Sequence, residues 1–497
     1  MSLEYSKAKN QSEICKWNSF YLHSTYNPET EAERFVNSLT IPFVPENIII
    51  LEPALSYCVP FLRIKFPSSK IYCIRFINDI KKTTLFEKEF LYSPENPESL
   101  TTTLFNYFGE TGLLSSFFIS WPPSSKAFSD YDKNVWKLVK NLLKDCQNIL
   151  ATRQFFSKRW IKNQINFLQN LKSVCSLKQT DLPILVCASG PSLNNSLKYI
   201  KILQNNFFII ACSSAIKALL ENNIIPDLCI TTDGGYWAKK HLNCLENIDH
   251  EIKIALPSEA NISKTLLSNH NIKIVPLAYC DNFDNFIYDN YKIPYIKAFR
   301  NGTISGTAVE LALTLTSTNV FICGVDLEAS KGFVHTQPNE LELENSQKDN
   351  RLNTIDKRTF AQGRDSVQLE LYRNWFISKS YEFSNRVYRV SDNHTFMNSL
   401  GRIIDINFND LSNLYNHFKV KNMNNFFTEC INVHIKKQDI VSIFKKLITD
   451  YKWKQNYFPA DCLMLKRVEN TDKYDEYLNR LNDKIKDIEN FLVKMES

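Results

Sequence analysis

The sequence between residues 183 and 233 alternates short apolar runs with stretches whose leucines and isoleucines repeat at helical spacing. Short apolar runs without charge are typical of strands that are buried on both faces of a parallel sheet. Three such runs, at 184–187, 207–211 and 228–232, each end in a loop of small or polar residues. The pattern predicts a β-α-β-α-β unit, and therefore an α/β domain with a doubly wound sheet, which binds ligands at the carboxyl ends of its strands.

The loop at 188–193 has the residue types that an anion-binding turn requires. Gly190 permits a tight turn, and Pro191 suits the first turn of the helix that follows. Backbone N–H groups at a helix N-terminus are a ready anion site. Two later loops have the same character, at 301–307 before a helix predicted at 308–315 and at 324–326 after a strand predicted at 320–323. Three such loops in one domain predict a ligand-binding edge of the sheet.

A second β-α-β pattern precedes this domain, with strands predicted at 47–51 and 70–74 and a helix at 59–65 between them. The turn at 52–57 contains no glycine, so its backbone cannot approach a phosphate closely. We therefore expect a Rossmann-like domain that binds neither a dinucleotide nor a methyl donor. Residues 112–121 are predicted to form its last strand.

The remaining segments are predicted to be mostly helical. Residues 133–174 are predicted to form a pair of connector helices, and the polar stretch 339–357 is predicted to be a mobile insertion. We expect four parts in the chain: an N-terminal Rossmann-like domain (1–130), a helical connector (131–178), a central α/β domain that carries the predicted ligand-binding edge (179–400) and a C-terminal helical region (401–497).

Composition argues against several classes of protein. The 497 residues carry a net charge of +6, which is spread along the chain and does not indicate a nucleic-acid partner. The 13 cysteines form no CxxC pair, so neither a zinc ribbon nor a disulfide framework is indicated. No apolar run is long enough to span a membrane, and the N-terminus lacks the apolar core of a signal peptide. We therefore expect a cytoplasmic protein.

Beyond these patterns, the chain resembles the motility accessory factor (Maf) glycosyltransferases of flagellin. The motifs that carry the resemblance are CASGPSL (187–193), IIPDLCITTD (224–233), GTISGTAVELAL (302–313), GVDLEASKGFVHT (324–336), HSTYNPETEAERF (23–35) and FFSKRWIKNQINFLQNL (155–171). The central domain is also similar to bacterial sialyltransferases, which use a CMP-activated nine-carbon acid sugar, and to archaeal hydroxymethyldihydropterin pyrophosphokinases (MptE-like), which use ATP. The resemblance implies a Rossmann-like N-terminal domain, a doubly wound, sialyltransferase-like α/β central domain and a helical C-terminal domain.

The resemblance also implies roles for residues at the predicted edge of the sheet. Asp233 and Asp326 would end strands that face one crevice, and Asp326 would help to hold the catalytic site in shape. The general base is not carried over from a matched residue. Position and chemistry favour His335, which lies nine residues after Asp326, since an unperturbed histidine pKa of about 6.5 leaves a proton-accepting form at cytoplasmic pH. Besides Asp233, the substrate-binding residues would be Ser189, Gly190, Pro191 and Ser192 for the phosphate and ribose of the nucleotide, Ser213, and Ser305, Gly306 and Thr307 for the nucleotide or the sugar carboxylate.

We therefore expect a transferase that moves a nonulosonic (sialic-acid-like) sugar from a CMP-sugar onto Ser or Thr of flagellin, for flagellar assembly and motility. The CMP-sugar is a substrate, and no cofactor is implied. No metal is implied either, because Asp233 has no second aspartate two positions away. Two alternatives stay open. One is an ATP-dependent 6-hydroxymethyl-7,8-dihydropterin pyrophosphokinase. The other is a non-catalytic flagellin-binding accessory protein, since the sialyltransferases have asparagine where this chain has Ser189 and Ser213.

Overall fold

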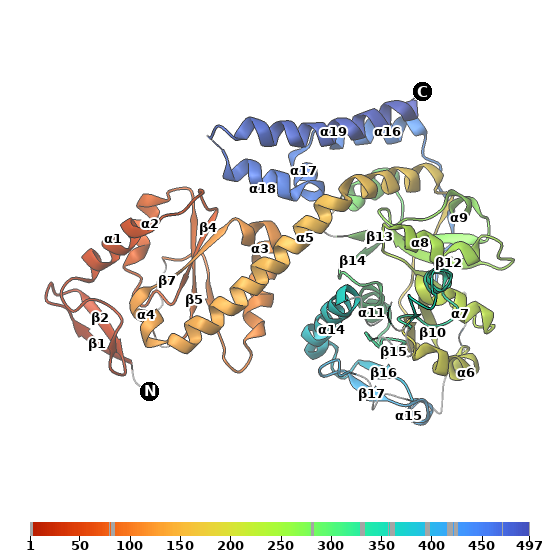
Figure 1. Ribbon diagram of the computed structural model, residues 1–497, viewed down its shortest axis with the longest axis horizontal. Helices are drawn as coiled ribbons and strands as arrows, with labels where there is room; N and C mark the ends of the chain where they lie inside the picture. The colour runs from red at the N-terminus through yellow and green to blue at the C-terminus, as the bar shows by residue number, and fades with distance from the viewer. Residues whose placement is uncertain are drawn as a thin grey trace. The chain divides into compact units, whose positions relative to one another are not determined.

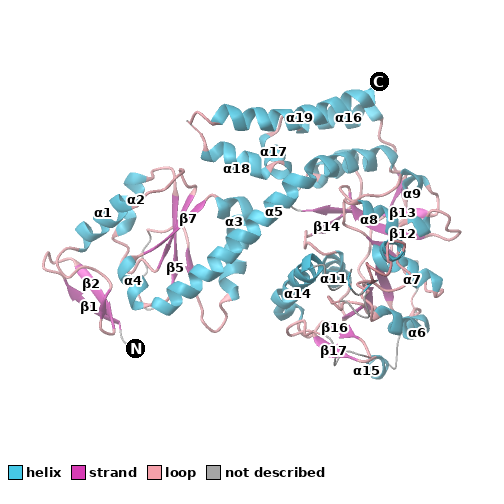
Figure 2. Ribbon diagram, in the orientation of Figure 1, coloured by secondary structure: helices cyan, strands magenta, loops and turns pink. Residues whose placement is uncertain are grey.

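A computed structural model describes residues 3–496 except 79, 81–84, 280–282, 329–332, 356, 358–362, 393–397, 415–420, 422–425 and 470. The chain divides into two compact units, Met1–Phe155 with Lys454–Asp487, and Phe156–Trp453 with Ile488–Ser497. Both units are mixed α/β structures with parallel sheets, as Figures 1 and 2 show. In the described part of the chain, no helix is long and apolar enough to cross a membrane.

The first unit contains a four-stranded parallel sheet in the order β6-β5-β4-β7. Its strands are β4 (Asn47–Leu51), β5 (Lys70–Arg75), β6 (Glu89–Leu91) and β7 (Ser116–Ser120). In Figure 1, α1 (Pro28–Ser38) and α2 (Cys58–Lys65) lie on one side of this sheet, and α3 (Glu98–Leu114) lies on the other. A separate antiparallel sheet consists of β1 (Leu3–Lys7), β2 (Glu13–Trp17) and β3 (Phe20–Tyr21).

The secondary structure predicted for this region is confirmed with one exception. The strands at 47–51 and 70–74 and the helix near 59–65 form as expected. The strand predicted at 112–121 is wrong at its start, because α3 continues to Leu114 and β7 begins at Ser116. Leu113 and Leu114 are buried, and a short apolar run does not by itself distinguish a buried helix end from a buried strand.

The carboxyl end of β4 is filled by the side chain of Glu52. The strand order reverses between β4 and β7, and a dinucleotide-binding fold places its ligand at such a switch point. The Glu52 carboxylate is fully buried and accepts hydrogen bonds from the Phe76 backbone N–H (2.7 Å) and from Arg75 (3.0 Å). The carboxylate of the protein itself thus uses the N–H and guanidinium groups that an anionic ligand would need at this edge.

We expect neither NAD nor S-adenosylmethionine to bind at this edge. Hydrogen–deuterium exchange of the intact protein, followed in peptides that cover 47–57 and 70–77, should show no added protection with either compound. Binding elsewhere in the chain would leave these peptides unchanged. Saturable protection of them would contradict the prediction.

His23 connects the stability of the first unit to pH. Its side chain is buried, and its Nε2 accepts a hydrogen bond from the Leu55 backbone N–H (2.9 Å). Burial lowers the pKa of His23 from 6.5 to about 3, so the folded protein keeps the ring neutral. An unfolded chain would protonate this ring below pH 6.5. The stabilising contribution of the neutral ring is therefore complete above pH 6.5 and is lost as the pH falls toward 3.

We expect this titration to lower the free energy of unfolding by about 2 kcal/mol between pH 7 and pH 5. Urea unfolding of the wild type and of His23→Gln at both pH values measures the effect. Glutamine retains an acceptor for the Leu55 N–H and cannot titrate. The wild type should lose about 2 kcal/mol more than the variant, and an equal loss in the two proteins would disprove the assignment.

The second unit is built on a long sheet whose order in the described residues is β17-β16-β15-β9-β10-β11-β12-β13-β8-β18, with β14 paired to β13. Its pairs are parallel except that β18 is antiparallel to β8. The strands are β8 (Ser173–Val174), β9 (Ile184–Cys187), β10 (Phe208–Cys212), β11 (Leu228–Ile230), β12 (Ile252–Pro257), β13 (Ile272–Tyr279), β14 (Ile296–Ala298), β15 (Val320–Cys323), β16 (Val387–Val390), β17 (Ile404–Ile406) and β18 (Ile431–Asn432).

The strand order fixes where a ligand crevice can form. The chain runs outward from β9 to β13 and then returns to place β15 on the other side of β9. The border between β9 and β15 is therefore the topological switch point of the sheet. Figure 1 shows helices on both sides of the sheet. On one side lie α11 (Ile304–Leu315) and α14 (Gly363–Phe383), and on the other lie α6 (Leu193–Leu203) and α7 (Ile216–Glu221).

Three predictions about helices are wrong in detail. The expected connector pair is one helix, α5 (Ser129–Asn170), because no glycine or proline interrupts its sequence. Part of the stretch predicted to be a mobile insertion is α12 (Glu340–Ser346), with Asn339 as its N-cap. The helix predicted at 308–315 begins four residues earlier, at Ile304.

The other helices are α4 (Pro122–Ala127), η1 (Ser213–Ala215), α8 (Tyr236–His241), η2 (Asn243–Leu245), α9 (Lys264–Ser268), α10 (Asp284–Tyr291), α15 (Phe408–Leu414), α16 (Lys437–Leu447), α17 (Tyr451–Tyr457), α18 (Pro459–Arg467) and α19 (Tyr474–Glu496).

Candidate functional site

At the switch point, the loops that follow β9 and β15 are in close backbone contact. The Gly190 N–H donates to the Gly324 carbonyl (2.7 Å), and the Ala188 N–H donates to the Cys323 carbonyl (2.9 Å). A Cβ atom on Gly190 would lie 2.5 Å from the Gly324 carbonyl oxygen and 2.7 Å from Cγ of Asp326. The absence of a side chain at Gly190 is therefore required by the approach of the two loops, whether or not a ligand binds there.

Asp326 holds Ser192 at the start of α6. Its Oδ2 accepts a hydrogen bond from the Ser192 backbone N–H (2.6 Å), and its Oδ1 accepts one from the Ser192 hydroxyl. Asp326 is buried, and this burial raises the pKa of its carboxyl above the ordinary value, although the two hydrogen bonds from Ser192 oppose the increase. The carboxylate thus connects the loop after β15 to the helix that follows β9, as a shaping role for Asp326 requires.

The backbone N–H groups at the start of α6 already have acceptors within the protein. The Ser192 N–H bonds to Asp326, and the N–H groups of Leu193 and Asn194 bond to carbonyls three residues back (3.0 and 3.2 Å). The Asp326 carboxylate occupies the place that an anionic ligand would take at this helix end. The N–H groups of Gly190, Ser192, Leu193 and Asn194 are therefore already used within the protein, whereas no acceptor for the Ser189 N–H is present among the described residues, so the prediction that residues 189–192 hold a phosphate stays a prediction.

The N-terminus of α11 differs in this respect. Ser305 and Gly306 lie in the first turn of the helix, after Thr303 as N-cap, and no side chain caps this end. The Thr307 N–H bonds to the Thr303 carbonyl (3.2 Å). Among the described residues, no acceptor is present for the backbone N–H groups of Ser305 and Gly306. At this predicted anion site, the backbone N–H groups of two consecutive residues could therefore donate hydrogen bonds to a ligand.

A serine cluster joins the loop after β9 to the segment that carries His335. The Ser214 hydroxyl donates to the Ser189 hydroxyl (2.7 Å), and the Thr336 N–H donates to the Ser189 carbonyl (2.7 Å). The Asn339 side chain donates to the Ser214 carbonyl (2.9 Å). These bonds bring His335, which precedes Thr336, to the same edge of the sheet as Ser189 and Asp326. Gly332, in the loop before it, lies outside the described residues.

His335 is partly exposed and lies against two other titratable side chains. Its Nδ1 is 3.5 Å from Oε1 of Glu342, and its ring centroid is 6.4 Å from that of His241 on α8. Burial would raise the pKa of Glu342, but the side chain of His335 and the Val334 N–H outweigh this effect and hold it below its ordinary value. Burial, together with the nearby charge of His335, lowers the pKa of His241 to about 4. At neutral pH Glu342 is therefore ionised and His241 is neutral.

Ser213 lies at the start of η1, directly after β10, and is buried. Its hydroxyl oxygen has no hydrogen-bond partner among the described residues, and the same holds for Thr231 directly after β11. The pairing of Cys212 with Ile230 places these two residues at equivalent positions on neighbouring strands. Their hydroxyl groups are thus available for hydrogen bonds that the described protein does not itself supply.

Asp233 and Gly306 both lie next to α14. A Cβ atom on Gly306 would come within 2.8 Å of the Trp375 ring, so close packing of that indole requires a glycine here. Burial raises the pKa of Tyr372, and the charge of Asp233 adds to the increase. The exposed Asp233 carboxylate accepts a hydrogen bond from the Gly235 N–H (2.8 Å). In the described residues no hydrogen bond connects Asp233 or Gly306 to the Ser192–Asp326 pair, so the predicted site residues form two groups along one edge.

Sequence reasoning missed a cluster around Arg300 at this edge. Its guanidinium carbon lies 4.7 Å from the ring centroid of Trp160 and 4.4 Å from that of Tyr279. The guanidinium N–H of Arg300 donates a hydrogen bond to the Glu259 carboxylate (2.8 Å). Trp160 comes from α5, and a Cβ atom on Gly234 would lie 2.6 Å from its ring. The pattern of α5 showed only an amphipathic helix, so nothing local in the sequence indicated that one of its residues reaches the loop after β11.

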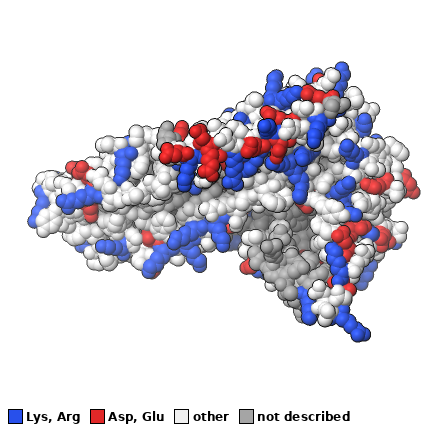
Figure 3. Space-filling model, turned by 45° about the horizontal axis from the view of Figure 1, so that its top comes forward, with Lys and Arg blue, Asp and Glu red and all other residues white. Residues whose placement is uncertain are grey.

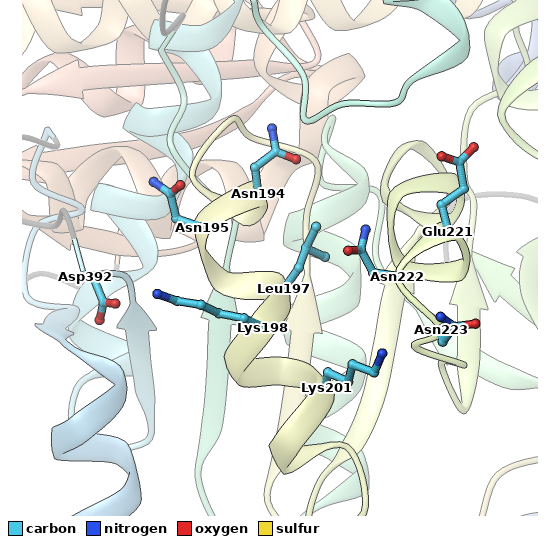
Figure 4. Close-up of a pocket in the computed structure, with 9 residues that line it drawn as sticks. All are labelled: Asn194, Asn195, Leu197, Lys198, Lys201, Glu221, Asn222, Asn223 and Asp392. Atoms are coloured by element: carbon cyan, nitrogen blue, oxygen red, sulfur yellow. The ribbon is translucent and has the colours of Figure 1, made fainter.

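A polar groove of about 630 Å³ runs along α6. Figure 4 shows Asn194 and Asn195 near the first turn of α6 and Lys198 extending toward Asp392. The Asn194 side chain is also 2.5 Å from the Thr336 hydroxyl, so one end of the groove adjoins the His335 segment. The groove is lined by Asn194, Asn195, Leu197, Lys198, Lys201, Glu221, Asn222, Asn223 and Asp392.

Neither the charge on the face seen in Figure 3 nor the placement of metal-ligating side chains in the described residues marks a second site. Figure 3 shows Lys and Arg interspersed with Asp and Glu over much of the visible face. Within the described ranges, no group of three or more His, Cys, Asp or Glu side chains is placed to hold a metal ion.

The chain is similar to known proteins both in sequence and in fold. Residues 158–332 match the family model described as 6-hydroxymethylpterin diphosphokinase MptE-like. An uncharacterized protein of Treponema pallidum (strain Nichols) is 29% identical over 304 residues, which are 60% of this chain and 65% of that protein, so the chain spans less than two thirds of its relative. The solved structure of a Maf glycosyltransferase from Magnetospirillum magneticum AMB-1 has a similar fold, with a TM-score of 0.56 and 12% identity over 99% of this chain and 92% of that one.

Proposed function

Because residues 158–332 match the MptE-like family and the chain has the fold of a Maf glycosyltransferase, we propose that the protein is a glycosyltransferase. We propose further that it moves a nonulosonic sugar from a CMP-sugar onto Ser or Thr of flagellin. The observation that carries the proposal is the edge of the second sheet, where His335, Asp326 and the uncapped start of α11 all lie. The donor and the acceptor rest on the motifs that resemble the Maf family.

The chemistry assigns a task to each part of this edge. The acceptor hydroxyl oxygen forms a bond to the anomeric carbon of the sugar while the bond from that carbon to the phosphate oxygen breaks. His335 takes the hydroxyl proton, and CMP leaves with the electron pair. Negative charge that develops on the phosphate is stabilised by backbone N–H groups, and those of Ser305 and Gly306 have no acceptor in the described protein. Asp326 holds the loop after β15 in shape through its hydrogen bonds with Ser192.

Nucleotide selectivity is the first test. Isothermal titration calorimetry of the intact protein should show CMP binding more tightly than ATP. The variant Gly302→Asn should bind both nucleotides as the wild type does. A Cβ atom at this position meets nothing within 4 Å, and asparagine tolerates its positive φ of 72°. Tighter binding of ATP, or binding of neither nucleotide, would contradict the CMP-sugar proposal.

The description of the matched family favours one other function, an ATP-dependent pterin pyrophosphokinase. That family model covers 175 residues, and the first unit, which lies wholly outside it, suits a protein acceptor better than a small pterin. Incubation with ATP and 6-hydroxymethyl-7,8-dihydropterin should release no AMP. Pterin-dependent AMP formation at a catalytic rate would replace the glycosyltransferase proposal with this one.

The acceptor is tested in cells. Mass spectrometry of flagellin from a strain that lacks this gene should show the loss of a nonulosonic acid from Ser or Thr, and the complemented strain should regain it. Flagellin that carries the same sugars in both strains would contradict the assigned acceptor. Normal modification together with defective filament assembly would favour the non-catalytic accessory role.

A further inference from the structure

We propose that Glu342 is the positioning residue for His335. Its carboxylate keeps the imidazole proton on Nδ1, so that Nε2 is the nitrogen that accepts the proton of the acceptor hydroxyl. The inference rests on the proposed function only for the role of His335 as a base. The contact between the two side chains is a property of the protein without substrate.

One carboxylate oxygen of Glu342 accepts hydrogen bonds from the backbone of Val334 and His335 and also faces the His335 ring. Oε1 accepts hydrogen bonds from the N–H groups of Val334 (3.0 Å) and His335 (3.2 Å) and lies 3.5 Å from Nδ1 of His335. The Glu342 side chain is only 2% exposed. The two backbone bonds fix the carboxylate relative to the His335 main chain, and the Nδ1 atom that faces it is buried and has no hydrogen-bond partner among the described residues.

The helix that carries Glu342 is itself attached to the edge of the sheet. Asn339 caps α12 by accepting from the Leu341 N–H (3.0 Å), and its amide donates to the Ser214 carbonyl (2.9 Å). Ser214 in turn donates to Ser189 in the loop after β9. The Glu342 carboxylate is therefore held relative to the sheet edge as well as to His335.

The charges around His335 leave Glu342 as the anion that faces Nδ1. His241, from α8, is the other titratable ring beside it, and burial lowers the pKa of His241 to about 4, so it carries no charge at pH 7. Glu340, on the same helix as Glu342, is paired with Lys217 at 2.6 Å. A neutral imidazole has one N–H, and a carboxylate can only accept, so the proton belongs on Nδ1 and Nε2 is left as the acceptor.

The tautomer of His335 is the direct test, and it requires no substrate. In the ¹⁵N-histidine NMR spectrum of the intact protein, recorded where the ring is neutral, the His335 signals should show protonated Nδ1 and unprotonated Nε2. His335→Gln identifies the signals. Glu342→Gln keeps an oxygen acceptor for the backbone N–H groups but removes the charge, and it should increase the Nε2–H form. The matched control is Glu344→Gln on the same helix, whose partner is Lys348 (3.5 Å) and which should change nothing.

The kinetic readout separates positioning from folding. Glu342→Gln should lower kcat by about 10²–10⁴-fold, as loss of the carboxylate partner of a catalytic histidine does elsewhere, with CMP affinity unchanged. Protonated Nε2 in wild-type His335 would overturn the inference whatever the variants do. So would an unchanged tautomer and full kcat in Glu342→Gln. If the tautomer is as expected but neither sugar transfer nor CMP binding occurs, the proposed function fails and the positioning contact stands.

Discussion

Replacement of His335 by alanine is expected to lower the rate of sugar transfer by about 10²–10⁴-fold and to leave CMP affinity nearly unchanged. The imidazole lies at the switch-point edge, connected through Thr336 to Ser189, whereas the N–H groups assigned to the phosphate belong to the backbone of α11. Loss of the ring therefore removes a proton acceptor without removing a phosphate contact. Steady-state kinetics with a CMP-nonulosonic acid and purified flagellin, together with calorimetry for CMP, measure the two effects separately.

The control for this variant is His270→Ala, because His270 is an exposed residue in the turn before β13. It should transfer sugar at the wild-type rate. Full modification of flagellin by His335→Ala in a complemented strain would mean that the histidine has an incidental role. A parallel loss of CMP affinity and rate would instead indicate that the substitution disturbs the loop after β9.

Replacement of Gly190 by alanine is expected to have the largest effect on stability at this site. The new Cβ atom would lie 2.5 Å from the Gly324 carbonyl oxygen, 2.7 Å from Cγ of Asp326 and 2.8 Å from Oδ2. The Gly324 oxygen belongs to the backbone, so the contact can be relieved only by separating the loops after β9 and β15. That movement breaks the 2.7 Å hydrogen bond between the two glycines and the bonds from Ser192 to Asp326.

Overpacking of this kind costs about 1–3 kcal/mol, and the broken hydrogen bonds add to the cost. Urea unfolding should therefore show a loss at or above about 3 kcal/mol, and sugar transfer should fall together with stability. Gly302→Asn lies in the same edge region, where a Cβ atom meets nothing within 4 Å, and should cost less than about 1 kcal/mol. Equal stabilities for the two variants would contradict the close approach of the loops.

The sequence by itself determined the local structure and its order along the chain. Apolar runs such as 184–187 and 320–323 became buried parallel strands, because an uncharged run of that length has few other stable environments. The helix after Pro191 followed from leucine spacing, and the small-residue loops at the strand ends predicted a ligand-binding edge. These features depend on neighbours a few residues away, and the motifs that resemble Maf proteins are equally local.

Only the tertiary structure decided which of these loops act together. Asp326 meets Ser192 across 134 residues because β15 is placed beside β9, a strand order that no local pattern specifies. That contact uses the N–H group of Ser192 at the start of α6, whereas the N–H groups of Ser305 and Gly306 at the start of α11 have no acceptor among the described residues. The residues at which helices and strands begin and end, such as the start of α11 at Ile304, also depended on tertiary packing. Glu342 lay in a stretch predicted to be mobile, and it became a partner of His335 because Asn339 caps α12 and attaches that helix to Ser214. Side-chain hydrogen bonds between distant segments depend on which strands are neighbours, and packing of the whole sheet settles that order.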